Sequence, residues 1–150
     1  MGLYQVLTDD LKQAMKAGDA FRRDTLRLLQ SAIKNVAIEK RQAPDELADS
    51  DVEQVIKRLT KQRKDSIEQF VAGNRADLAA KEQAELDLLS GYLPEAMPEG
   101  ELRALVATAL TEAGMTAVNQ NGQAMGVAMK KVAGRAAGED VRRIVESLLV

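Results

Sequence analysis

The sequence predicts an all-α protein, with an N-terminal helical bundle of about four helices followed by a small C-terminal three-helix domain. Three observations support this. Aromatic residues make up only 3% of the 150 residues, so aliphatic side chains must fill the interior, as suits helix packing. Apolar residues recur at helical spacing, and no segment alternates as a β-strand does. Gly and Pro interrupt the apolar pattern where helices would end.

The first two helices are expected to meet at Gly18. Gly18 ends the first helix, and Asp19 is placed to cap a second helix that runs to about Lys40. The second helix has a wide apolar set that includes Phe21 and Leu28, so we expect neighbours on two of its sides. The apolar stripe of the first helix consists of Leu3, Val6, Leu7, Leu11 and Met15.

The third and fourth helices follow a loop around Pro44. Ser50 and Glu53 have the spacing of a capping box and predict the start of the third helix, which ends at Gly73. The fourth covers about residues 76–91. The third helix carries an apolar stripe of Val52, Val55, Ile56, Leu59, Ile67, Phe70 and Val71.

Two prolines, Pro94 and Pro98, fall within five residues and interrupt the helical pattern. Pro98 suits the first turn of a new helix. We therefore expect an N-terminal helical domain over residues 1–94 and a C-terminal domain over residues 95–150. The expected helices of the second domain cover about residues 99–113, 122–133 and 139–149.

Composition excludes several classes of chemistry. The chain has no Cys and no His, which removes disulfides, thiolate zinc sites and imidazole catalysis. The net charge is −2, so the chain is not a strongly basic nucleic-acid binder. No apolar run is long enough to span a membrane, and no nucleotide-binding or hydrolase motif is present. We expect no catalytic residues, no metal and no cofactor, in a cytoplasmic protein.

Charged residues fall on the apolar faces of two helices. At 100° per residue, Arg63 lies about 20° from Val52 on the third helix, and Ser66 is also within the stripe. Glu82 and Glu85 likewise share the apolar side of the fourth helix. We predict a partly buried ion-pair network of Arg63, Glu82 and Glu85 that fixes helix register. The alternative is a polar pocket that receives a ligand.

The C-terminal segment combines glycines with basic residues. Small residues allow close helix approach, and five cations are available to contact phosphates. The alternative is that Lys130 and Lys131 stabilise a helix C-terminus and Gly134 is its C′ cap. The candidate RNA-binding residues are Gly122, Gly126, Lys130, Lys131, Gly134, Arg135, Gly138, Arg142 and Arg143.

The chain resembles the GatB/YqeY family almost from end to end. The shared pattern covers residues 26–35 (LRLLQSAIKN), 61–70 (KQRKDSIEQF) and 75–78 (RADL), then Glu82, Glu85, Leu86 and residues 92–94 (YLP). The resemblance implies an all-helical, bacterial protein of translation. Its C-terminal domain would be similar to the tail of the aspartyl/glutamyl-tRNA amidotransferase B subunit, which helps engage tRNA while a separate domain performs the chemistry.

The tail departs from the family pattern at two positions. Gln123 replaces the usual lysine, and Ala137 stands where aspartate is frequent. Our first hypothesis is a non-catalytic, tRNA-associated accessory protein whose N-terminal bundle is a scaffold or partner-docking surface. A second is a component that assists glutamine-dependent amidation of misacylated tRNA, the carbon–nitrogen ligase reaction of the relatives. A third is a protein-interaction module without an RNA role, favoured by the acidic pI of about 5.3.

Overall fold

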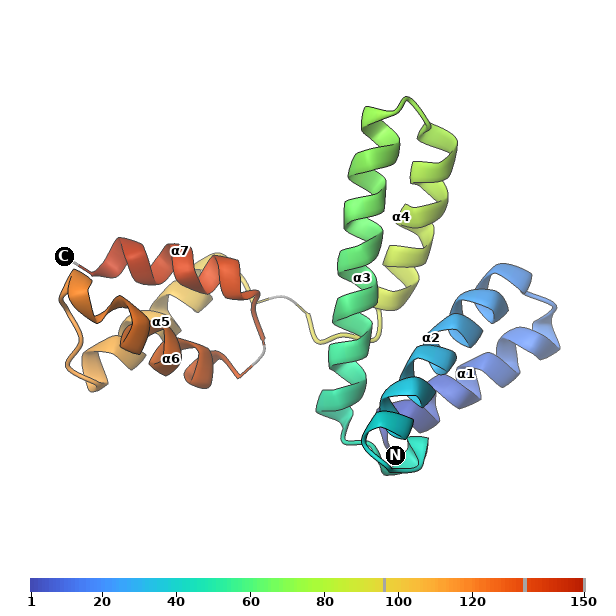
Figure 1. Cartoon of the computed structure of the whole chain (residues 1–150), viewed down its shortest axis with the longest axis horizontal. Helices are drawn as coiled ribbons and strands as arrows, with labels where there is room; N and C mark the ends of the chain where they lie inside the picture. The colour runs from blue at the N-terminus through green and yellow to red at the C-terminus, as the bar shows by residue number, and fades with distance from the viewer. Residues whose placement is uncertain (96, 134, 150) are drawn as a thin grey trace. The chain divides into compact units, whose positions relative to one another are not determined.

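The computed structural model describes residues 1–95, 97–133 and 135–149. In these ranges the chain forms seven α-helices and two short 3-10 turns, and none of these residues lies in a β-strand. The prediction of an all-α protein is confirmed. The chain divides into two compact units, residues 1–93 and 94–150 (Figure 1). Each unit contains its own hydrophobic core.

The N-terminal unit consists of two helical hairpins. The first is formed by α1 (Leu3–Ala17) and α2 (Ala20–Glu39), and the second by α3 (Asp49–Ala72) and α4 (Ala76–Ser90). A 3-10 turn, η1 (Pro44–Glu46), lies in the connection between them. The hairpins contact each other where α2 meets α3 and the end of α4, and they diverge toward their tips (Figure 1).

The turn of the first hairpin forms as the sequence predicts. Gly18 adopts a left-handed conformation with φ of 70°, and its N–H bonds the last carbonyls of α1. Glycine reaches this conformation without the steric penalty that a Cβ imposes. The Asp19 side chain then accepts a hydrogen bond of 3.1 Å from the Arg22 N–H and caps α2.

The start of α3 differs from the predicted capping box. Ala48 is the N-cap, and the N–H groups of Asp51 and Val52 bond its carbonyl at 2.9 and 3.2 Å, so Ser50 lies inside the first turn. The Asp49 carboxylate instead accepts a hydrogen bond of 2.8 Å from the Leu3 N–H at the start of α1. Asp49 therefore bonds the first turn of α1, and the N–H groups that begin α3 have no side-chain cap among the described residues.

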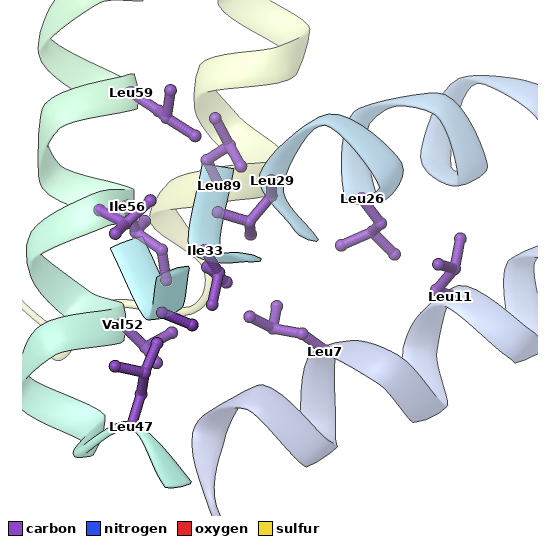
Figure 2. Packing of buried hydrophobic residues seen from close by; sticks show 12 residues of the cluster. Leu7, Leu11, Leu26, Leu29, Ile33, Leu47, Val52, Ile56, Leu59 and Leu89 are labelled. Atoms are coloured by element: carbon purple, nitrogen blue, oxygen red, sulfur yellow. The ribbon is translucent and has the colours of Figure 1, made fainter. Parts of the chain in front are cut away.

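The core of the N-terminal unit lies where the two hairpins meet. Figure 2 shows Leu7 of α1 and the α2 residues Leu29 and Ile33 packed toward α3 and the end of α4. The largest side chains in this unit that are almost completely buried are Leu26, Leu29, Ile33, Val52, Ile56 and Leu89. Four predicted core residues are exposed instead, because no neighbouring helix covers their positions: Met15, Phe21, Leu28 and Val71.

The tip of the second hairpin carries little core. Beyond Thr60, none of the described residues of α3 is buried. In the N-terminal half of α4, which lies opposite, Ala79 is the only described residue that is buried. Ile67 and Phe70 are partly buried. The first hairpin packs only on the base of the second, so the tips leave helix faces open to solvent.

The C-terminal unit contains α5 (Glu99–Glu112), a 3-10 turn η2 (Val118–Gln120), α6 (Asn121–Val132) and α7 (Gly138–Leu148). Its core is aliphatic and is built from every helix, with Val106, Ala124, Ala128, Val132, Val141, Ile144 and Val145 at its centre. Across both units, no helix within the described ranges has the length and apolar character needed to cross a membrane.

The end of α6 differs from the predicted glycine cap. The left-handed residue that follows Val132 is Ala133, with φ of 53°. Its N–H bonds the Met129 carbonyl at 3.0 Å. The expected C′ residue, Gly134, lies outside the described residues.

Candidate functional site

A groove opens in the N-terminal unit where the hairpins begin to diverge. Its volume is about 350 Å³. We call it the hairpin groove. One wall is α2, the other is α4, and α3 contributes one residue between them. The lining residues are Phe21, Asp24, Thr25 and Leu28 of α2, Arg63 of α3, and Lys81 and Glu85 of α4.

The α2 wall presents one face of the helix. Phe21, Thr25 and Leu28 are spaced i, i+4 and i+7, so their side chains lie on the same side. Thr25 is buried, but Phe21 is 42% exposed and Leu28 is 48% exposed. The helical pattern marked both as core residues. In the folded unit they are large apolar side chains at the edge of a groove.

Arg63 and Glu85 form an ion pair between α3 and α4. Arg63 Nε lies 3.3 Å from Glu85 Oε2, and the two side chains are only 11% and 18% exposed. Arg63 Nη1 also donates a 3.3 Å hydrogen bond to the Leu59 carbonyl. The buried Nε–H approaches the carboxylate without hydrogen-bond geometry and has no acceptor among the described residues. The contact is therefore electrostatic, with one donor left unsatisfied.

The predicted network is reduced to this single pair. Glu82 is half-buried on α4, yet it makes no ion pair within the described part of the chain. Ser66 is half-buried on α3. Breaking a fully buried pair costs about 3–5 kcal/mol. The residual exposure of Arg63 and Glu85 places their pair below that range.

The remaining charges of the groove differ in whether they are paired. Asp24 accepts a 2.9 Å hydrogen bond from Arg23 Nε, and this bond lowers the pKa of the Asp24 carboxyl. Lys81, on the opposite wall, makes no ion pair with any described residue. The groove therefore combines two apolar side chains with two carboxylates, Asp24 and Glu85, that each contact an arginine. Its lysine, Lys81, has no ion-pair partner among the described residues.

A second polar cluster in the N-terminal unit lies beside its core. Tyr92, which packs against the core, donates a 2.6 Å hydrogen bond to Asp10 Oδ2. Arg22 Nη2 approaches the same carboxylate at 3.7 Å. Burial, followed by the bond to Asp10, raises the pKa of Tyr92 to about 12. This cluster fastens the chain after α4 to α1 and α2.

In the C-terminal unit, three candidate glycines, Gly122, Gly126 and Gly138, lie at no close helix contact, and the fourth, Gly134, is outside the described residues. Gly122 and Gly126 are exposed on α6, and a Cβ added at either one would meet no atom within 4 Å. At Gly138 the nearest atom would be Met129 Cε, at 4.0 Å. The expectation that these glycines allow close approach of neighbouring helices is wrong for Gly122 and Gly126.

The five candidate cations are all exposed. Lys131 lies 3.9 Å from Glu112, and Arg143 pairs with Glu99 and Asp140. Arg135 Nε donates a 3.4 Å hydrogen bond to the Val132 carbonyl. Lys130 and Arg142 make no ion pair within the described ranges. Lys130 and Lys131 occupy the last turn of α6, where cations offset the negative end of the helix dipole.

Comparison with known proteins extends along nearly the whole chain. Residues 4–149 match the family described as Yqey-like protein. A protein of the yeast Lachancea thermotolerans, named altered inheritance of mitochondria protein 41, mitochondrial, is 38% identical over 141 residues, covering 91% of this chain and 71% of the yeast protein.

Two further relatives carry the same name. The Saccharomyces cerevisiae (strain YJM789) protein is 41% identical over 98 residues, which are 65% of this chain and 51% of that protein. The protein of Vanderwaltozyma polyspora is 41% identical over 97 residues, which are 62% of this chain and 51% of that protein. The matches to these two relatives therefore cover about half of their length.

These relatives correct the functional expectations from the sequence. Their name refers to mitochondrial inheritance and not to tRNA. The predicted tRNA-associated function, including help in tRNA amidation, is therefore wrong, and so is the link to translation. The expectation of a bacterial, cytoplasmic protein is wrong for the same reason, since the relatives are yeast proteins named as mitochondrial.

Proposed function

The chain belongs to the YqeY-like protein family, and from the geometry of its N-terminal unit we propose that it is a docking protein that binds a segment of a partner protein in the hairpin groove. One observation carries the proposal. Phe21 and Leu28, two large apolar side chains, stand exposed on the same groove as the partly buried pair of Arg63 and Glu85.

The energetics of the groove favour an occupant. Full burial of a Leu or Phe side chain is worth about 1.5–3 kcal/mol, so covering the exposed parts of Phe21 and Leu28 is worth roughly 1 kcal/mol each. A few well-placed apolar residues provide most of the energy in many protein interfaces. The polar rim supplies orientation, since Lys81 and Asp24 flank the apolar side chains.

The ion pair serves this function as well as stability. Arg63 and Glu85 connect α3 to α4 at the level where the core ends. By holding α4 in register with α3, the pair positions the α4 wall of the groove relative to Arg63 between the walls. A register-fixing pair and a ligand-receiving groove are thus two roles of the same residues.

Matched variants on α2 test the proposal. Leu28 lines the groove, whereas Ile38 is 73% exposed on the same helix and does not. Leu28→Glu and Ile38→Glu therefore introduce the same charge at two exposed sites. We expect a partner protein to copurify with the parent chain and to rebind it when purified. This protein should be lost with Leu28→Glu and retained with Ile38→Glu. Equal retention by both variants would reject the groove as the docking site.

A further inference from the structure

We infer that the segment bound in the hairpin groove is an amphipathic α-helix, with apolar anchors along one face and a carboxylate beside them. This inference rests on the docking function proposed above and adds the chemistry of the partner. The shape of the groove walls, the spacing of the apolar side chains and Lys81, which makes no ion pair with a described residue, support it.

The walls of the groove favour a helix over an extended peptide. Both walls are α-helices, and the described ranges contain no strand edge to which an extended segment could add by main-chain hydrogen bonds. The hairpins diverge from the shared core toward their tips (Figure 1). A helix laid between them would pack against α2 on one side and α4 on the other, as helices pack in a bundle.

The spacing of the apolar side chains matches helical anchors. Phe21 and Leu28 are seven residues apart on α2, which corresponds to about two turns and roughly 10 Å along the axis. Apolar residues at i, i+3 or i+4, and i+7 on an incoming helix repeat over the same length. The buried Thr25 lines the groove between the two anchors.

The charges of the groove specify an acidic partner. Asp24 is hydrogen-bonded to Arg23, and Glu85 is paired with Arg63, so both carboxylates are compensated. Lys81 makes no ion pair with a described residue. A carboxylate of the incoming helix would pair with Lys81 at the rim. Exposed pairs of this kind contribute about 0.2–1 kcal/mol, so the charge sets orientation more than affinity.

A second folded copy does not offer such a helix through α7. That helix has acidic residues in its first turn, Glu139 and Asp140, but its apolar residues Val141, Ile144 and Val145 are buried in the core of its own unit. We therefore do not assign the groove to α7 of a second copy, and the proposal commits to a helix of another protein.

Selection from a displayed library of random 16-residue peptides on the purified full chain tests the inference. Binders are counter-selected on the Leu28→Glu variant, whose helical content is first checked by circular dichroism. We expect enriched peptides with apolar residues at i, i+3 or i+4, and i+7, and with Asp or Glu beside them. Lys81→Glu should weaken these binders roughly threefold and favour Lys- or Arg-containing peptides instead.

The outcomes separate the two proposals. Leu28-dependent peptides that contain central prolines or alternate as strands would overturn the helical partner and leave docking in the groove intact. Leu28-dependent helical peptides whose affinity is unchanged by Lys81→Glu would overturn the acidic partner. If no peptide is enriched on the parent chain over the Leu28→Glu variant, the helical partner is overturned and the groove is disfavoured as a docking site. The copurification of Leu28→Glu and Ile38→Glu tests the docking site independently.

Discussion

Arg63 of α3 lies 3.3 Å from Glu85 of α4, at the level where the core of the N-terminal unit ends and the hairpins begin to diverge. The Arg63 guanidinium also bonds the Leu59 carbonyl, so it is fixed to its own helix as well as to the neighbouring one. One ion pair therefore joins two helices and contributes to the groove proposed to bind a partner.

Replacing Arg63 by Met should destabilise the N-terminal unit. The change removes the counter-charge of Glu85, which is 18% exposed, and leaves this carboxylate partly desolvated. We expect a loss of about 1–3 kcal/mol in the free energy of unfolding, measured by urea denaturation.

The double-mutant cycle with Glu85→Gln provides the control. If the pair is coupled, Arg63→Met combined with Glu85→Gln should cost less than the sum of the two single changes, with a coupling energy of about 0.5–3 kcal/mol. Strict additivity would show that the two side chains contribute to stability independently and would contradict the described pair.

Part of this site could be predicted from the sequence. Helical phase alone placed Arg63 and Glu85 on apolar faces, and the structure brings them together. It placed Glu82 there equally well, yet Glu82 makes no ion pair in the described chain. Phase specifies the direction of a side chain from the helix axis. It does not specify how two helices are offset along their axes, and this offset decides which carboxylate of α4 Arg63 reaches.

The apolar wall of the groove could not be predicted in the same way. Phe21 and Leu28 have the helical spacing of core residues, and the sequence contains no sign that they differ from Leu26 or Leu29 in burial. Their exposure results from the divergence of the hairpins, which leaves this part of α2 without a covering neighbour.

Gly126→Ala should stabilise the C-terminal unit. Gly126 lies inside α6, and an added Cβ would meet no atom within 4 Å, so the substitution gains helix propensity without a clash. We expect a gain of about 1 kcal/mol, seen as a higher melting temperature by calorimetry. Loss of stability would mean that the glycine provides a close helix contact after all.

Ala133→Gly should also be stabilising, through backbone strain. Ala133 has φ of 53°, and a left-handed conformation costs a residue with a Cβ about 1–2 kcal/mol more than it costs glycine. The higher entropy of glycine in the unfolded chain offsets part of this gain. We expect a net increase of roughly 0.5 kcal/mol in the unfolding free energy. A decrease at this site, with Gly126→Ala behaving as expected, would contradict the left-handed end of α6.

Tyr92 should make stability dependent on alkaline pH. Its pKa is raised to about 12 in the folded protein, against 10.0 as the usual value. The unfolded chain therefore releases this proton first, and the stabilisation is present below pH 10 and declines as pH rises toward 12. In Tyr92→Phe this component of the decline should be absent. Parallel pH profiles of parent and variant, measured by chemical denaturation, would contradict the partly buried hydrogen bond to Asp10.

Photo-crosslinking in living cells tests the docking function most directly. A photoreactive amino acid replaces either Leu28, inside the hairpin groove, or Ile38, exposed on the same helix outside it. The account predicts one discrete crosslinked product from position 28, identified by mass spectrometry as an acidic, helix-bearing protein, and none of this product from position 38. The same product from both positions, or no product from position 28, would contradict it.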